Sequence, residues 1–234
     1  MQTSGTILIL TGAGISAESG LGTFRDSDGL WEQVPITEVA TPQAFVRDPQ
    51  KVHDFYNMRR QAAGRAQPNA THHALARLQR DWPDPVVLIT QNVDALHEAA
   101  GSTALHMHGA LSGAVCAACD HRWPAPALMA PSDACPHCGK AATRPDIVWF
   151  GEMPHHLPAI DRHLSDCALF VAIGTSGAVY PAAGFVAEAA CHGAATLEIN
   201  AAATDVSEAF EQHIIGPAST VVPDWVDTLL AQHS

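Results

Sequence analysis

A short apolar run that ends in a glycine-rich turn constrains the fold of this chain more than any other stretch. Residues 7–10 are apolar and mostly β-branched or leucine, and small residues with Ser16 among them follow. This pattern predicts a buried strand that turns abruptly into a helix, with a serine of the capping type at the junction. Because Gly12 and Gly14 lack a Cβ, the backbone there can approach a pyrophosphate, and the first N–H groups and dipole of the helix attract negative charge. The stretch is a candidate dinucleotide cradle.

Gly12, Gly14 and Ala17 satisfy a relaxed G-x-G-x-x-[GA] fingerprint. Glycine-rich turns between a strand and a helix also occur in α/β proteins that bind no nucleotide. Residues 21–31 depart from the nucleotide-binding unit of hydride-transfer enzymes. In that unit the glycine-rich turn is followed by a long helix and then by a second strand with an acidic residue at its tip. This segment instead places turn-forming residues around Phe24, Arg25 and Trp31, so we expect a loop there.

Length and composition bound the class of protein. A chain of 234 residues with 47% hydrophobic and 15% charged residues can bury one large core and a small satellite module. The sequence has neither a signal-peptide pattern nor an uninterrupted apolar run of about 18 residues, so we expect a cytoplasmic protein without membrane segments. The formal net charge of −12 argues against affinity for nucleic acid or anionic membranes. Any phosphate binding must be local.

Two C-x-x-C pairs indicate a metal site. Cys116 and Cys119 precede Cys135 and Cys138 by a spacing that is typical of structural zinc ribbons. Four thiolates close a tetrahedral site and leave no open position for catalysis, so we expect one structural zinc ion. The alternative, two disulfides, fits poorly with a chain that lacks a secretion signal.

Further apolar runs predict a doubly wound parallel sheet. Residues 86–89 and 169–173 are apolar, residues 196–200 alternate polar residues with Leu197 and Ile199, and each run ends in or is followed by small or polar residues. The first delivers Gln91, Asn92 and Asp94 to the carboxyl edge of the sheet, where open α/β sheets bind ligands, although Asn and Asp are also common helix caps. We predict a large Rossmann-like domain of residues 1–27, 76–112 and 146–234. Residues 28–75 and 113–145 would form a smaller helical and zinc-ribbon module.

The predicted small module begins with a helical, polar-faced segment from Trp31 to about residue 66, entered through Thr41 as a cap and Pro42 in the first turn. Within it, Tyr56 and Arg59 are three residues apart and share a helical face. One interpretation is a solvated arginine above a half-buried tyrosine. The other is a carboxylate clamp, in which the guanidinium donates two parallel hydrogen bonds and the phenol a third.

Two segments beside the zinc module also carry side chains of interest. His106 and His108 lie at strand spacing before Gly109, and an imidazole beside a nucleotide cradle suits general-base work on a sugar hydroxyl; a single histidine can equally be structural. Residues 144–152 form an extended apolar segment, which is either ordinary core or an edge to which a peptide adds as a strand.

Taken together, these motifs resemble the sirtuins, a family of NAD-dependent protein-lysine deacylases, over essentially the full length of the chain. The matching segments are residues 12–20, 23–25, 90–94, 106–109, 148–152 and 174–176 and the two C-x-x-C pairs. The resemblance is strongest to the bacterial class III members, whose Tyr and Arg pair recognises acidic acyl groups and corresponds to Tyr56 and Arg59. Ala40 corresponds to the small residue that leaves their acyl pocket wide.

The resemblance implies a set of site residues and cofactors. His108 would be the catalytic base, NAD would be consumed as a cosubstrate, and Cys116, Cys119, Cys135 and Cys138 would hold one structural zinc ion. Residues expected to bind the substrate are Ala40, Tyr56, Arg59, Val148, Phe150 and Gly151. Residues expected to line the NAD site are Gly12, Ala13, Gly14, Ser16, Ala17, Phe24, Arg25, Trp31, Gln91, Asn92, Val93, Asp94, Gly174, Thr175, Ser176, Asn200 and Ala218.

The resemblance also implies a reaction. The carbonyl oxygen of an acyl-lysine attacks the anomeric carbon of the nicotinamide ribose and nicotinamide leaves; His108 then accepts a proton from the ribose hydroxyls, and lysine and O-acyl-ADP-ribose result. We expect removal of succinyl, malonyl and acetyl groups from lysine-containing proteins or peptides by a monomeric enzyme. The alternatives are a mono-ADP-ribosyltransferase with the same NAD site and a non-catalytic binding module, which an intact His108, Asn92 and Asp94 disfavour.

Overall fold

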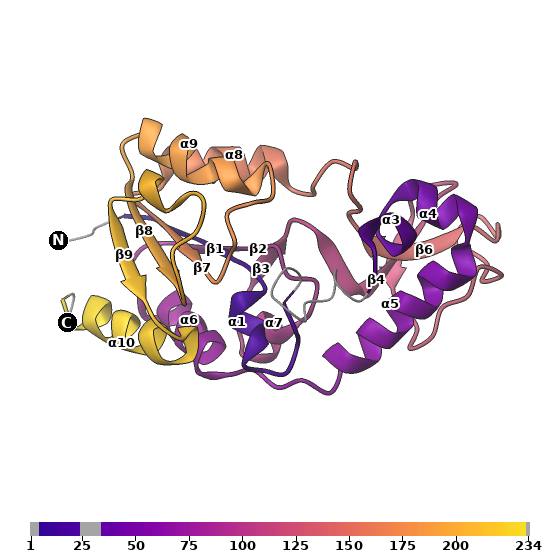
Figure 1. Ribbon diagram of the computed structural model, residues 1–234, viewed down its shortest axis with the longest axis horizontal. Coiled ribbons are helices and arrows are strands. Elements are labelled where there is room, and N and C mark those ends of the chain that lie inside the picture. The colour runs from indigo at the N-terminus through magenta and orange to yellow at the C-terminus, as the bar shows by residue number, and fades with distance from the viewer. Residues whose placement is uncertain (1–4, 24–33, 233–234) are drawn as a thin grey trace.

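The computed structural model describes residues 5–23 and 34–232. Within them a parallel sheet of six strands has the order β3-β2-β1-β7-β8-β9 (Figure 1). The sheet consists of β1 (Ile7–Thr11), β2 (Val86–Thr90), β3 (Ala104–His106), β7 (Leu169–Ile173), β8 (Ala195–Asn200) and β9 (Gln212–Ile215). The strand order reverses direction between β1 and β7, the neighbours at the centre of the sheet. In open α/β sheets, ligands bind beyond the carboxyl ends of the strands at such a point.

Helices cover both faces of this sheet (Figure 1). On one face α6 (Ala70–Asp81) and α10 (Ala218–Ala231) pack against it, with the short helices α1 (Gly14–Ala17) and α7 (Leu96–Ala99) at the carboxyl edge. On the other face lie α8 (Leu157–Asp166) and α9 (Phe185–Cys191). A 3-10 turn at Ala182–Gly184 directly precedes α9. β1 and β7 are buried along their whole length because both faces are covered.

A smaller module lies at the far end of the molecule from β9 (Figure 1). Its antiparallel sheet has the order β5-β4-β6, with β4 (Gly109–Cys116), β5 (Arg122–Pro124) and β6 (Thr143–Ile147). The helices α3 (Ile36–Val39), α4 (Pro42–Arg47) and α5 (Pro49–Ala63) pack beside it around a separate apolar cluster that contains Val52, Phe55 and Trp149.

The predicted fold class is confirmed, and two local predictions need correction. Thr41 caps α4, since its hydroxyl oxygen accepts a hydrogen bond from the Ala44 N–H at 3.1 Å. The helix predicted over residues 31–66 is divided into three within the described residues, because Asp48 precedes a proline, which disfavours helical backbone, and caps α5 instead. Ser16 is not a cap: Ala13 occupies the N-cap of α1, and Ser16 lies buried within that helix.

The predicted division into domains stays a proposal, and the packing near its boundaries is informative. Leu75, at the end of the predicted segment 28–75, is fully buried in the core of the large sheet with Leu78. Ile147 and Trp149, which follow the predicted segment 113–145, pack in the apolar cluster of the smaller module. The two modules therefore meet along segments that contribute side chains to both cores.

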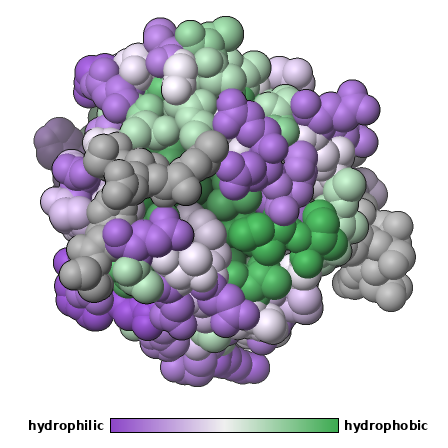
Figure 2. Space-filling view, turned by 90° about the vertical axis from the view of Figure 1, so that its left-hand side faces the viewer, coloured by the Kyte–Doolittle hydropathy of each residue, from purple (hydrophilic) through white to green (hydrophobic). Residues whose placement is uncertain are grey.

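Figure 2 views the end of the molecule on which the β9 edge of the sheet lies, and it shows apolar surface among mostly polar residues. Ile215 of β9 is one of the exposed large apolar side chains, and β9 has a neighbouring strand on one side only within the described residues. No helix within residues 5–23 and 34–232 has both the length and the apolar character needed to cross a bilayer.

Candidate active site

A cavity of about 660 Å³ connects the carboxyl edge of the large sheet with helix α5 of the smaller module. Most of the predicted site residues line it, although they come from segments far apart in the sequence. From the predicted NAD set these are Gly12, Ala13, Gly14, Ala17, Gln91, Asn92, Val93, Gly174, Thr175, Ser176, Asn200 and Ala218. His108 and the predicted substrate residues Ala40, Tyr56, Arg59, Val148, Phe150 and Gly151 line the same cavity.

The glycines of the first loop allow two loops to touch. A Cβ on Gly12 would lie 2.6 Å from the carbonyl oxygen of Gly174, and one on Gly14 would lie 2.8 Å from the Gly174 Cα. Gly174 itself has φ +61°, and a Cβ there would lie 2.7 Å from the Ile15 nitrogen. The loops after β1 and β7 therefore pack backbone against backbone, which any side chain would prevent. The resulting floor of the cavity carries no side chain at these three positions.

Asn92 ties the two adjacent loops of the cavity together. Its side-chain amide donates hydrogen bonds to the Gly12 carbonyl at 3.0 Å and to the Ser16 hydroxyl at 3.1 Å. Ser16 in turn donates to Asp94 at 3.1 Å. Ser16 and Asp94 are buried and, unlike the other predicted NAD residues that the structure describes, do not line the cavity. Their role in this structure is to hold Asn92 and the first loop in place.

Gln91 and Asn200 order the loop that follows β7. The Gln91 amide donates to the Thr175 hydroxyl at 2.8 Å, and the Asn200 amide donates to the Thr175 carbonyl at 3.0 Å. Polar groups from the ends of β2, β7 and β8 thus converge at one side of the cavity. Such groups suit ribose hydroxyls and a carboxamide.

His108 lies between β3 and β4 and lines the cavity. β3 ends at His106, so His108 is in the turn rather than in the strand. The Gln91 carbonyl lies 3.1 Å from its Nδ1. Burial lowers the pKa of His108, although this carbonyl acts in the opposite direction. A Cβ on the following Gly109 would lie 2.0 Å from the Asp146 carbonyl, so a close approach of β4 and β6 fixes this turn.

Tyr56 and Arg59 form the end of the cavity that lies in the smaller module. Both side chains project from the same face of α5, and Ala40 is buried nearby in the apolar cluster of Val52 and Phe55. Burial lowers the pKa of the Arg59 guanidinium and raises that of the Tyr56 phenol. The Arg59 guanidinium and the Tyr56 phenol are thus two hydrogen-bond donors in this part of the cavity wall, among apolar neighbours such as Ala40 and Phe55.

The four cysteines of the C-x-x-C pairs meet at one point. Their Sγ atoms all lie within 4.8 Å of one another, with 3.6 Å between Cys116 and Cys138 and 3.8 Å between Cys119 and Cys135. A tetrahedral zinc site with Zn–S bonds of about 2.3 Å requires separations of about 3.8 Å. All four cysteines are free, so the disulfide alternative does not hold. The donor set fits one structural zinc ion.

Comparison with known proteins decides the family. The model of the Sir2 family matches residues 12–181. The chain belongs to the Sir2 family. An NAD-dependent protein deacylase of Caulobacter vibrioides is 50% identical to this Sir2 chain over 231 residues, which cover 97% of each protein. The predicted resemblance to sirtuins is confirmed.

Solved Sir2 structures have the same fold. A crystal structure of a Sir2 homologue in complex with NAD is 38% identical, with a TM-score of 0.91 over 100% of this chain and 92% of that one. The structure of Sir2Af2 bound to a myristoylated histone peptide is 28% identical, with a TM-score of 0.76 over 99% and 94% of the two chains.

Sequence reasoning missed a polar network beneath the cavity of this Sir2 chain. His97 of α7 is buried, and its Nε2 lies 3.0 Å from the Thr11 hydroxyl, which donates to Thr90 at 2.9 Å. Thr90 also accepts the Asn92 N–H at 3.0 Å. The ring of His72 packs edge-on against that of His97, with centroids 5.2 Å apart. The histidine five residues after Asn92 was the available signal, and only the topology reveals its partners.

Sequence reasoning also missed the side chains that support the Tyr56 end of the cavity. The indole Nε1 of Trp149 donates to the Tyr56 hydroxyl at 3.0 Å. Arg144 stacks on the Trp149 ring, with its guanidinium carbon 3.5 Å from the centroid, and forms two hydrogen bonds with Glu152 at 2.7 and 2.9 Å. Trp149 lies within the recognised segment 148–152, so its position was known but its partner was not.

Helix α5 joins the Tyr56 end of the cavity to the zinc ribbon. The Asn57 side chain donates to the Met129 carbonyl at 2.8 Å and accepts the Met129 N–H at 2.9 Å. Arg60 donates to the Leu111 carbonyl at 2.7 Å. The helix that carries Tyr56 and Arg59 is thus attached, by a neighbouring stripe of residues, to the module that the zinc ion would hold together.

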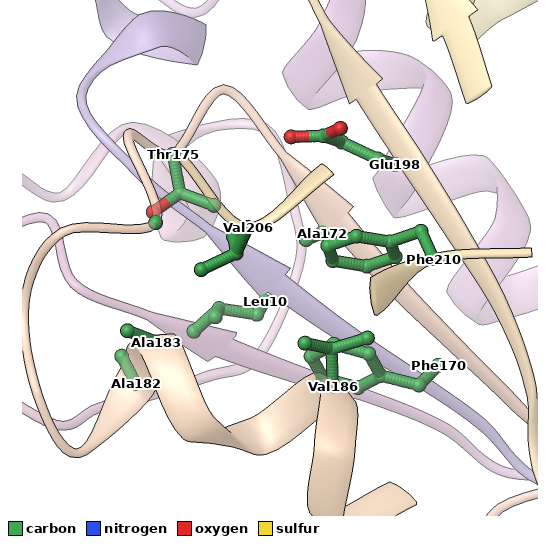
Figure 3. A pocket seen from close by; sticks show the side chains of 11 residues that line it. Leu10, Phe170, Ala172, Thr175, Ala182, Ala183, Val186, Glu198, Val206 and Phe210 are labelled. Carbon is green, nitrogen blue, oxygen red and sulfur yellow. The ribbon is translucent and has the colours of Figure 1, made fainter. Parts of the chain in front are cut away.

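The structure does not bear on three predicted NAD residues, because Phe24, Arg25 and Trp31 lie outside the described residues. A second cavity, close to β1, β7 and α9, measures about 10 Å³ (Figure 3). Apolar side chains such as Leu10, Phe170 and Phe210 line it. It has room for about one water molecule, so it cannot hold a cofactor or an acyl group.

Proposed function

We propose that this Sir2 chain removes acyl groups from protein lysines with consumption of NAD and that it prefers the acidic acyl groups succinyl and malonyl over acetyl. The observation that carries the proposal is that Tyr56 and Arg59 line the same cavity as His108. An acyl-lysine that places its carbonyl near His108 extends its acyl chain toward α5, where a carboxylate finds two donors.

The electrostatics of Arg59 favour an anionic group at that position. An arginine side chain stays protonated in proteins, and burial destabilises its charge, as the lowered pKa indicates. A carboxylate in the cavity offsets that cost because charge-assisted hydrogen bonds are the strong ones. A methyl group at the same place offers no such compensation. The protein therefore gains more from succinyl or malonyl than from acetyl.

The remaining residues divide between the two substrates. We assign NAD to the part of the cavity between the loops after β1, β2, β7 and β8, where Gln91, Asn92 and Asn200 offer polar groups. We assign the acylated peptide to the segment containing Val148, Phe150 and Gly151. Phe150 is 40% exposed, so this segment can meet a peptide from solvent. The solved Sir2 protein with a myristoylated histone peptide supports an acylated peptide as the partner.

His108 supplies the general base. Its Nδ1 faces a carbonyl oxygen, which can only accept, so the neutral ring keeps its lone pair on Nε2. That atom can take a proton from a ribose hydroxyl after nicotinamide has left. The zinc ion would be held by Cys116, Cys119, Cys135 and Cys138, and its contribution is to the fold of the small module.

A panel of four peptides that differ only in the acyl group tests the proposal. The purified protein is incubated with NAD and succinyl-, malonyl-, acetyl- or butyryl-lysine peptide, and kcat/KM is measured for each. Butyryl has the chain length of succinyl without its carboxylate. We expect kcat/KM at least about tenfold higher for succinyl than for butyryl, the effect of one charged hydrogen-bond pair. Equal values, or a preference for butyryl, would overturn acidic-acyl recognition.

The products of the same incubations test the reaction itself. O-acyl-ADP-ribose with nicotinamide indicates deacylation, and ADP-ribose attached to protein indicates the mono-ADP-ribosyltransferase. No release of nicotinamide indicates a binding module. That the protein is monomeric and cytoplasmic, and that it binds neither nucleic acid nor membranes, stay predictions from the sequence.

A further inference from the structure

The hydrogen bond between Trp149 and Tyr56 restricts where the phenol can send its own proton. The indole N–H is a donor and never an acceptor, so across their 3.0 Å contact the Tyr56 oxygen accepts. The phenol O–H must point in another direction. Among residues 5–23 and 34–232 no acceptor for that proton lies within hydrogen-bond distance. Tyr56 lines the cavity, and the cavity is the direction in which a partner can enter.

Trp149 is itself held firmly. It is 2% exposed, and Arg144 covers its ring with the guanidinium carbon 3.5 Å from the centroid. Glu152 binds Arg144 through both carboxylate oxygens and also accepts the Trp149 backbone N–H at 2.8 Å. Phe45 packs on the same ring at a centroid distance of 5.2 Å. A side chain fixed on its ring and at its backbone presents its N–H at a fixed point.

We propose that Trp149 is a specificity-determining residue, which acts by occupying the Tyr56 oxygen as an acceptor and so turning the phenol proton toward the carboxylate of an acidic acyl group. The inference deepens the acidic-acyl preference proposed above and rests on it. The ordinary pKa of a tyrosine is about 10 and burial raises that of Tyr56, so the phenol is protonated at neutral pH. An indole donor also polarises the phenol and strengthens it as a donor.

The substitution Trp149→Phe tests this role, because it keeps an aromatic ring for Arg144 and Phe45 and removes the N–H. Succinyl- and acetyl-lysine peptides are compared at saturating NAD. We expect the ratio of the two kcat/KM values, succinyl over acetyl, to fall about fivefold, the effect of weakening one neutral hydrogen bond. The fall should come mainly from a higher KM for the succinyl peptide. An equal loss on both peptides would show that Trp149 merely supports the site and would overturn the proposal.

A double-mutant cycle with Tyr56→Phe separates action through Tyr56 from general damage. If Trp149 acts through the phenol, Trp149→Phe causes no further fall of the ratio in the Tyr56→Phe background. The same fivefold fall in that background would overturn the proposal. Trp82→Phe is the matched control, since Trp82 donates its indole N–H to the Gly5 carbonyl at 3.2 Å and packs in the core of the large sheet. It should leave the ratio as it is in the wild type.

The outcomes distinguish this inference from the proposed function. If the wild type does not prefer succinyl over butyryl, the acidic-acyl proposal fails and the inference fails with it. The inference alone is wrong under a different set of results. These are that the wild type has that preference, that Tyr56→Phe removes it, and that Trp149→Phe does not. Thermal melting of each variant shows whether it is folded, and Trp149→Leu, which also has no side-chain donor, replaces Trp149→Phe if that variant is unfolded.

Discussion

The carbonyl oxygen of Gln91 lies 3.1 Å from Nδ1 of His108 and fixes which ring nitrogen carries the proton. A carbonyl can only accept, so Nδ1 donates and Nε2 is the basic atom. Burial lowers the pKa of the ring, which keeps it neutral at physiological pH. The loop that follows β2 therefore both lines the cavity and sets the tautomer of the proposed base.

Replacing His108 with alanine should lower kcat for every acyl peptide by about 10²-fold to 10⁴-fold, the usual contribution of a general base. In the wild type, kcat should fall as the pH drops through the lowered pKa of His108, so the acidic limb lies below the ordinary histidine value of about 6.5. Steady-state assays from pH 5 to 8 measure both. His73→Ala, an exposed histidine on α6, is the control. Undiminished turnover of His108→Ala would exclude this role.

Arg59→Met should separate acidic from neutral substrates. Loss of a charged hydrogen bond costs about 1.5–3 kcal/mol, which corresponds to a fall of about 10-fold to 150-fold in kcat/KM for succinyl-lysine. Deacetylation should fall much less, because acetyl has no carboxylate to lose a partner. Kinetics on matched peptides measure both values, and Arg65→Met, at an exposed arginine after α5, is the control. Equal losses on the two substrates would argue against a carboxylate clamp.

The parts of the site that sequence could predict are those carried by local pattern. The apolar runs of β1, β2, β7 and β8 and the C-x-x-C spacing are local, and each was predicted close to its observed place. β9 was missed because its four residues, Gln212–Ile215, are half polar and mostly exposed, as befits an edge strand. α8 and α10 were missed as well, and in α10 Pro223 lies inside the helix and interrupts its pattern.

The contacts that sequence could not predict join residues far apart in the chain. Trp149 and Tyr56 are separated by 93 positions, and His97 and Thr11 by 86. Ser16 resembled a cap because serine is common at helix N-caps. In the structure its hydroxyl is buried and forms hydrogen bonds with Asp94 and Asn92 instead of with the helix N–H groups. The sequence could supply the candidate residues, and only the topology could supply their partners.

Zinc removal and a substitution of Asn57 should both weaken the contact between α5 and the zinc ribbon. Asn57→Ala leaves the Met129 N–H and carbonyl without their buried partner, which should lower the free energy of unfolding by about 1–3 kcal/mol. The melting temperature then falls by about 2–4 °C for each kcal/mol. Differential scanning calorimetry measures the shift, and Asp54→Ala, on the exposed face of α5, is the control. Treatment with a zinc chelator should destabilise the wild type too; a melting temperature unchanged by both treatments would contradict the link.

Two buried neutral histidines should make the protein less stable as the pH falls from 7 to 5.5. Burial lowers the pKa of His72 to about 4 and that of His97 to about 3. Below the ordinary histidine pKa of about 6.5, these histidines bind protons in the unfolded chain but stay neutral in the folded chain. The free energy of unfolding therefore falls as the pH falls. Between pH 7 and pH 5.5 each histidine costs about 1 kcal/mol by this linkage. His106 beside Glu98 acts in the opposite direction, because its pKa is raised.

Urea unfolding at pH 7 and pH 5.5 measures this loss, and His97→Gln assigns it. Glutamine does not titrate, and its amide nitrogen can take the place of Nε2 as the donor to Thr11. The variant should therefore lose about 1 kcal/mol less than the wild type between the two pH values. If the wild type were as stable at pH 5.5 as at pH 7, or if His97→Gln kept its full pH dependence, His97 would not be the neutral buried group that holds Thr11 and, through Thr90, the Asn92 loop.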